Sequence, residues 1–247
     1  MNPRAAVIVT ALFLASTACR GGGPTAAPSV TEGAAATTRP PSSASSGDCE
    51  NPYLPVVEGA TYNRKSTSSL GDSTQTSTIK DVRPNGFSVE RTGVLSSGKP
   101  YTYLENWSCT PQGLVQAPTD ELAAIATGAN ATVTVETVSN DGVTLPKDVK
   151  AGDTWTETFT VNVIGPNSTS PWTVQYEFEA IGTESVTVPA GAFTALHLTN
   201  QITWVNGAVP PMKVDYWFAP EVGLVKSGYT MEGLGSGTTE LITYTIP

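Results

Sequence analysis

The sequence predicts an all-β domain, built as an antiparallel open barrel or sandwich with at most one short helix. Apolar and polar residues alternate with a period of two along much of the chain from residue 49 onward, which is typical of strands that bury one face. Turn-forming pairs such as Asp141-Gly142 and Asn206-Gly207 separate these runs. A repeated motif divides the domain into two meanders of similar plan.

The N-terminal residues 1–18 are typical of a signal peptide. A positive charge at Arg4 precedes an apolar stretch over residues 5–15, which is too short to span a membrane. The small residues Ser16 and Ala18 lie just before Cys19. This segment resembles the lipobox of bacterial lipoproteins, although Ser16 stands where that pattern usually has Leu. The resemblance implies lipidation at Cys19, and secretion by cleavage near the same bond is the alternative.

The segment that follows, residues 19–48, has the composition of a disordered linker. Gly, Pro, Ala, Ser and Thr dominate it, and Val30 is its only bulky apolar residue. Such a segment buries too little surface to offset its chain entropy. A flexible chain of this length has a root-mean-square reach of about 30 Å. A lipidated Cys19 would therefore tether the domain at a distance from the membrane.

Two cysteines remain once Cys19 is lipidated, and they are Cys49 and Cys109. An exported chain with one such pair favours a disulfide, which would close a long loop. Loop-closure entropy predicts a stabilisation of roughly 4 kcal/mol. Two buried thiols are the alternative.

The body of the chain, residues 49–247, reads as strand almost throughout. Residues 153–165, 172–182 and 192–204 each place apolar side chains on one face by period-two alternation. One helix candidate covers residues 119–127, because Thr119 can cap its first turn and Gly128 can end it. Nine residues are few for a stable helix, so a loop is the alternative.

An internal repeat is visible by eye. Residues 106–116 (NWSCTPQGLVQ) align with residues 216–226 (YWFAPEVGLVK), so that Trp107 matches Trp217 and both segments contain Gly-Leu-Val. Upstream, residues 59–62 (GATY) resemble residues 152–155 (GDTW). The predicted repeat halves are about 56–117 and 148–247, and we expect the matched tryptophans to play matching structural roles.

Composition excludes several functional classes. The net charge of −9 and the 13 Lys and Arg residues argue against nucleic-acid binding, which needs clustered cations. One histidine and three cysteines leave little for a metal site, and no phosphate-binding loop or other cofactor motif occurs. A catalytic triad would have to use His197, which alternation places on the face opposite to Leu196 and Leu198. We therefore expect no cofactor and no enzymatic activity.

One pair of charges falls on faces that are otherwise apolar. Glu157 lies between Trp155 and Phe159 on its predicted strand, and the repeat places Arg64 at the corresponding position of the first half. Since an isolated buried charge is costly, the two could point inward and pair. Exposure at strand ends is the alternative.

Three segments resemble a pattern in uncharacterised bacterial exported lipoproteins. These are VPAGAF (188–193), DYWFAPEVGLVK (215–226) and NPYLPVVEGATY (51–62). In those proteins a V-P-A-G-x-F turn leads into a long strand, and a Y-W-x-A-P-x-V-G-L-V-K strand pair follows. The resemblance implies an antiparallel β fold, similar to the open barrel of periplasmic lipoprotein carriers, and it implies no reaction.

These observations together predict a membrane-tethered lipoprotein on the extracytoplasmic face of the cell envelope. The leading functional hypothesis is a non-catalytic binding module for an apolar or envelope ligand. The alternative is a structural or protein-interaction component of the envelope. A concave apolar surface would favour the first hypothesis, and a flat exposed apolar patch would favour the second.

Overall fold

The computed structural model describes residues 47–69, 71–94, 98–116, 134–165, 168–205, 210–233 and 235–247. The chain divides into two units, residues 1–38 and 39–247, and all described residues belong to the second. The predicted signal peptide, Cys19, nearly all of the predicted linker and the helix candidate 119–127 lie outside the described residues.

The described residues form strands and no helix, which confirms the predicted all-β class. No segment among them is a helix that could cross a bilayer. Thirteen strands join one antiparallel sheet in this part of the chain. Their bounds are β1 Thr61–Ser68, β2 Gly71–Arg83, β3 Gly86–Val94, β4 Pro100–Thr110, β5 Gly113–Gln116, β6 Thr134–Gly142, β7 Leu145–Pro146, β8 Thr154–Gly165, β9 Ser168–Val188, β10 Gly191–Trp204, β11 Met212–Ala219, β12 Gly223–Met231 and β13 Gly235–Thr245.

The strand order reflects the repeat. Strands β1–β5 follow one another as neighbours in the sheet, and β8–β12 do the same. The matched segments 59–62 and 152–155 lead into β1 and β8, and the matched Gly-Leu-Val motifs begin β5 and β12. Strand β13 lies between the two meanders, where it pairs with β12 on one side and β1 on the other. Two five-stranded meanders therefore share one continuous sheet.

The sheet curls into a barrel that its backbone does not close. Its edge strands are β6 and β7, which lie at opposite ends of the strand order although only two residues separate them in the chain. Thr144 lies in this connection: its N–H donates to the Leu114 carbonyl (2.9 Å), and its hydroxyl donates to Glu157 Oε1 on β8 (3.1 Å). The predicted fold, an antiparallel open barrel or sandwich, is confirmed, and a side-chain bridge spans the seam between the edges of the sheet.

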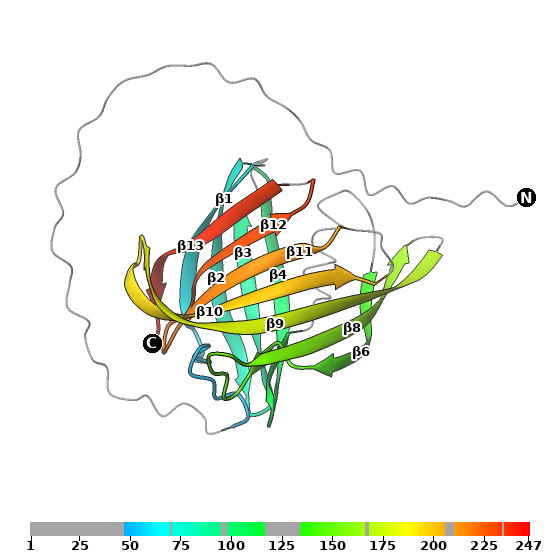
Figure 1. Cartoon of the computed structure of the whole chain (residues 1–247), viewed down its shortest axis with the longest axis horizontal. Coiled ribbons are helices and arrows are strands. Elements are labelled where there is room, and N and C mark those ends of the chain that lie inside the picture. Colours follow the sequence, from blue (N-terminus) through cyan, green and yellow to red (C-terminus); the bar gives the residue numbers. More distant parts are fainter. Residues whose placement is uncertain are drawn as a thin grey trace, which may run out of the picture. The chain divides into compact units, whose positions relative to one another are not determined.

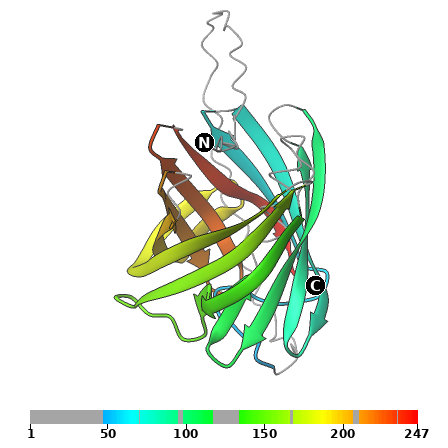
Figure 2. The same ribbon diagram turned by 90° about the vertical axis from the view of Figure 1, so that its right-hand side faces the viewer.

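The core lies on the inner face of the curled sheet, and Figures 1 and 2 show how its strands are arranged. Figure 2 shows β1–β4 on one side of the molecule and β9–β12 on the other. Buried side chains from both sides meet toward the end of the sheet where β2, β4, β9 and β11 finish. We call the opposite end, where β1, β3, β10 and β12 finish, the mouth. The central members of the core are Tyr62, Ile79, Phe87, Leu114, Leu145, Leu196, Leu198, Val225 and Leu241.

The two matched tryptophans occupy corresponding strands but face opposite ways. Trp107 pairs with the fully buried Phe87 and stacks on it at 5.6 Å between ring centroids. Trp217 pairs with His197 on the outer face, opposite to Leu196 and Leu198. Both tryptophans are half buried and pack against the core, as predicted, but they lie on opposite faces of the sheet. The physical reason is that β-bulges lie beside His197 and Trp217, whereas β3–β4 and β4–β5 pair without a shift.

Candidate functional site

A group of polar and charged side chains lies on the inner face of the first meander, just above the core toward the mouth. We call Arg64, Ser77, Arg91 and Glu105, which come from β1, β2, β3 and β4, the arginine cluster. Strand alternation places each of them on the same face as core residues. Arg64 is 8% exposed and Glu105 is 2% exposed. The first meander therefore brings four hydrogen-bonding side chains together in a largely buried position.

Hydrogen bonds join the members of the arginine cluster. Arg91 Nε donates to Glu105 Oε1, and Arg91 Nη1 donates to the Ser77 hydroxyl at 3.0 Å. Arg64 Nη1 donates to the same hydroxyl at 3.2 Å, and its Nη2 donates to the Leu224 carbonyl at 3.1 Å. Arg91 thus pairs with the carboxylate, while the charge on Arg64 meets a hydroxyl and a carbonyl.

Several buried polar atoms beside this network lack a hydrogen-bond partner. They are Arg64 Nε, Glu105 Oε2 and the hydroxyl of Tyr62, whose ring lies 5.2 Å from the Arg64 guanidinium. Burial and, to a smaller extent, the nearby Arg91 lower the pKa of Arg64 to about 9, against the opposing effects of Tyr62 and Glu105. Burial raises the pKa of Tyr62 to about 12. Buried polar groups in folded proteins are nearly always paired, so these atoms indicate a place for a further polar partner.

The inner face of the second meander carries apolar and aromatic side chains near the mouth. They form a second cluster beside the main core, joined to it through Tyr216, and most of its members are only half buried. Its members come from β9, β10, β11 and β12, so it belongs to one wall of the barrel. We call this cluster the aromatic wall: Val174, Tyr176, Ile202, Trp204, Met212, Val214, Tyr216 and Tyr229.

The two walls differ in chemistry although both belong to one sheet. The first meander presents the arginine cluster, and the second presents half-buried aromatic rings. At the other end of the barrel the walls pack together as one core. An inner surface with one polar, cationic wall and one apolar wall suits a molecule that has both a charged and an apolar part.

Arg64 and Glu157 both point inward, as one hypothesis expected, but their predicted pairing is wrong. Glu157 is 1% exposed and accepts hydrogen bonds from Asn140 and Thr144, each at 3.1 Å. Desolvation raises the pKa of Glu157 to about 7, although these two hydrogen bonds oppose the shift. Arg64 is instead bonded to Ser77 and Leu224. The reason is topological, because β8 and β1 lie six positions apart in the sheet and each charge finds partners on nearer strands.

His197 lies on the outer face, within a cluster that the sequence did not predict. Its ring stacks on Trp217 at 4.6 Å between centroids. One ring nitrogen lies 3.0 Å from the Asp215 carboxylate, and the other lies 3.4 Å from the Glu184 carboxylate. Lys226 Nζ lies over the Trp217 ring, 5.5 Å from its centroid. His197 is thus removed from the inner face and from the arginine cluster.

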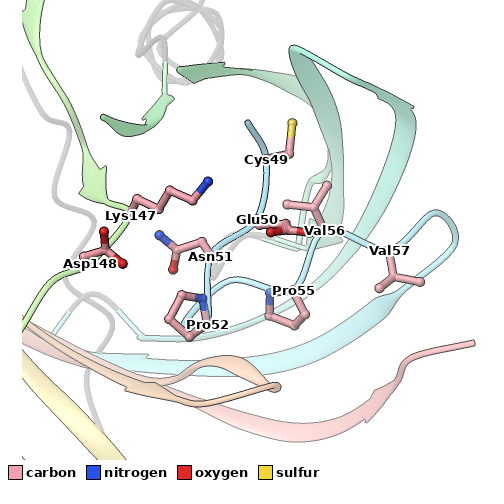
Figure 3. A pocket seen from close by; sticks show the side chains of 9 residues that line it. All are labelled: Cys49, Glu50, Asn51, Pro52, Pro55, Val56, Val57, Lys147 and Asp148. Atoms are coloured by element: carbon pink, nitrogen blue, oxygen red, sulfur yellow. The ribbon is translucent and has the colours of Figure 1, made fainter. Parts of the chain in front are cut away.

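Cys49 and Cys109 are joined by a disulfide, as predicted, with 4.8 Å between their Cα atoms. The bond ties the leading segment to the end of β4, beside a pocket of about 380 Å³ (Figure 3). Asn51 in that segment donates to the Pro146 carbonyl at 3.0 Å and accepts from the Tyr53 N–H at 2.9 Å. These contacts dock the leading segment against β7. The pocket is lined by Cys49, Glu50, Asn51, Pro52, Pro55, Val56, Val57, Lys147 and Asp148.

The described residues contain no group of three or more His, Cys, Asp or Glu side chains placed to bind a metal ion. The functional residues that sequence reasoning missed are Ser77, Arg91 and Glu105. A signal existed, because Arg91 follows Phe87 and Val89 at period-two spacing and Glu105 precedes Trp107 in the same way. A charge at an otherwise apolar inward position marks a buried polar site.

A protein-family model described as DUF3108-like matches residues 115–241, just over half of the chain. The chain belongs to the DUF3108-like family. This DUF3108-like segment runs from β5 into β13 and includes the aromatic wall. The arginine cluster lies before the matched residues. None of the curated proteins matches the chain.

Two solved structures share the fold of this DUF3108-like protein. One is a protein of Bacteroides fragilis assigned as exported and as having a YmcC-like fold, with 17% identity and a TM-score of 0.54 over 78% of this chain and 98% of the other. The second is a protein of Parabacteroides distasonis assigned as a lipoprotein, with 18% identity and a TM-score of 0.53 over 80% of this chain and 100% of the other. These similarities extend beyond the family match and support one fold across both meanders.

Proposed function

We propose that this protein is a lipid-anchored extracytoplasmic binding protein without catalytic activity. Its ligand has an apolar part that lies against the aromatic wall. The observation that carries the proposal is the aromatic wall itself, a half-buried apolar cluster on an inner surface. Apolar side chains that stay partly exposed beside a packed core are a common feature of ligand sites.

The location of the remaining groups supports binding over catalysis and over docking of a flat partner. His197 contacts two carboxylates and an indole on the outer face. The large exposed apolar side chains of the described residues come one from each of six segments, and they are Val94, Leu104, Val138, Ile181, Val205 and Tyr244. Single exposed apolar residues are ordinary on protein surfaces and do not form a docking patch.

The signal-peptide pattern, Cys19 and the family resemblance support the proposed anchoring. The similar structures include a protein assigned as a lipoprotein and one assigned as exported. A lipidated cysteine followed by a linker would place the barrel outside the cytoplasmic membrane. An envelope molecule with an apolar part is the class of ligand available there.

Native mass spectrometry of the full-length Cys19→Ala protein, released by its own host without detergent, tests the role. We expect a co-purifying species that is bound with defined stoichiometry. Tyr229→Glu places a charge in the aromatic wall and should remove this species. Ile181→Glu, at an exposed position of β9, is the matched control and should retain it. A protein that carries no bound species and does not bind dodecanol would contradict the role and favour a structural component of the envelope.

A further inference from the structure

The arginine cluster contains more positive than negative charge in a buried position. Arg64 and Arg91 contribute two cations, and Glu105 contributes one carboxylate, which Arg91 engages. Arg64 is bonded to the Ser77 hydroxyl and the Leu224 carbonyl, neither of which carries a charge. An uncompensated buried cation is costly, so a site of this kind is completed by an anion.

Two buried hydrogen-bond donors without a partner, at Arg64 and its neighbour on β1, could bind the oxygen atoms of an anion. Arg64 Nε and the Tyr62 hydroxyl are buried donors without a partner, and they lie on neighbouring inward positions of β1. Guanidinium groups bind carboxylate and phosphate oxygens through charge-assisted hydrogen bonds. The low pKa of Arg64 agrees with this geometry, because burial in a site without a partner anion disfavours its charged form.

Part of the arginine cluster is exposed to solvent. Arg91 keeps 21% of its side chain exposed, although its partner Glu105 is 2% exposed. Beyond Arg64 on β1, the inward Ser66 is only half buried. A ligand whose apolar part rests on the aromatic wall could therefore direct its polar end toward β1 and β3.

We infer that Arg64 binds an anionic head group, a carboxylate or a phosphate, at the polar end of an apolar ligand. This inference rests on the proposed binding role and specifies the chemistry of its ligand. The net charge of −9 disfavours non-specific attraction of anions, so anion binding has to come from a local site such as Arg64.

Isothermal titration calorimetry at pH 8 tests the inference. The full-length Cys19→Ala protein is titrated with monomeric dodecanoate, with dodecyl phosphate and with neutral dodecanol. We expect at least one of the two anions to bind about tenfold more tightly than dodecanol, and the stronger of the two identifies the head group. Arg64→Gln should reduce the affinity for that anion to the level of dodecanol and leave dodecanol binding unchanged. Lys65→Gln, the exposed neighbour on the opposite face of β1, should retain the preference.

Each other outcome overturns a specific claim. Equal binding of all three probes, or an Arg64→Gln protein that keeps its preference for the anion, overturns the inference and leaves the binding role intact. No binding of any probe overturns the binding role and the inference with it. If Arg64→Gln does not fold, Tyr62→Phe replaces it, since it removes one unpartnered hydroxyl and keeps the ring. That variant should lose about threefold or more in affinity for the anion alone, and unchanged affinity would overturn the inference.

Discussion

At the scale of single residues, the polar side chains inside the barrel follow two different patterns. Glu157 is buried as part of the seam, where Asn140 and Thr144 donate to its Oε1. Arg64 is buried without a partner anion. The first pattern satisfies a carboxyl group within the fold, and the second leaves hydrogen-bonding capacity for another molecule.

Glu157 should make stability depend on pH. Its pKa is about 7 in the folded protein against an ordinary value of 4.5, so the folded state binds more protons between these two values. Below about pH 4.5 Glu157 therefore makes its full contribution to stability. As the pH rises through 7, this contribution is lost and the free energy of unfolding falls by about 3 kcal/mol in total. Denaturant unfolding of wild type and Glu157→Gln at pH 5 and pH 8 measures this fall.

The amide of Glu157→Gln can still accept from Asn140 and Thr144, so the variant should lose this pH dependence and be the more stable form at pH 8. Glu179→Gln, at an exposed position of β9, should have the same stability as wild type at both pH 5 and pH 8. A Glu157→Gln protein with an unaltered pH dependence would show that the carboxyl group is not responsible.

At the scale of elements, the two meanders repeat their strand order more faithfully than their side-chain environments. The β4–β5 and β11–β12 hairpins share a tryptophan followed by Gly-Leu-Val. Gly113 in the first hairpin has a φ of +151°, and an added Cβ would lie 2.3 Å from the Leu145 carbonyl oxygen. Gly223 in the second has a φ of +99° and more space around it. In the first hairpin glycine allows β5 to lie close to β7, and in the second it allows a backbone conformation that other residues rarely adopt.

The matched tryptophans should therefore differ in their contribution to stability. Trp107→Ala removes the ring that stacks on the buried Phe87 and should cost about 3–5 kcal/mol. Trp217→Ala removes a half-buried ring of the outer face, which contacts His197, Lys226, Glu184 and the edge of the core, and should cost less, about 1–2 kcal/mol. Chemical denaturation of each variant gives the comparison. Equal costs would mean that the bulges do not separate the two environments.

The Cys49–Cys109 disulfide links the leading segment to the first meander. Cys49→Ala should lower the free energy of unfolding by roughly 4 kcal/mol, because the bond restricts a long loop in the unfolded chain. The double variant Cys49→Ala/Cys109→Ala should show nearly the same loss, since both remove one bond. Peptide mapping without reductant checks the pairing directly. Two thiols that alkylate freely in the native protein would refute it.

At the scale of the whole molecule, one sheet supplies both walls because it curls until its edge strands approach each other. The short connection between β6 and β7 requires this closure, since these strands end the sheet on opposite sides. The polar wall and the aromatic wall come from different meanders, so the binding surface that we propose exists only when both have folded.

Lipidation at Cys19 should control where the whole protein resides. Cys19→Ala removes the thiol that would carry the acyl chains, so the protein should move from the membrane fraction to the soluble exported fraction. Detergent partitioning of host fractions measures this, and Cys49→Ala, which leaves the predicted anchor in place, is the control. Continued partitioning of Cys19→Ala into detergent would exclude the proposed anchor.

The sequence by itself determined the all-β class, the two meanders and the cysteine pair. Period-two alternation, turn residues and the repeated Gly-Leu-Val motif are local signals, and they locate β8, β9, β10 and the two matched hairpins without any long-range information. The inward direction of Arg64 and Glu157 also follows from alternation along one strand.

Only the tertiary structure decided which inward residues meet and which way the matched tryptophans face. Bulges beside His197 and Trp217 shift the register, and such shifts depend on pairing between strands that the local pattern does not encode. Likewise, β13 inserts between the meanders and separates Arg64 from Glu157. The convergence of Arg64, Ser77, Arg91 and Glu105 depends on the pairing of four strands, because contacts across a sheet are set by register and curvature rather than by spacing along the chain.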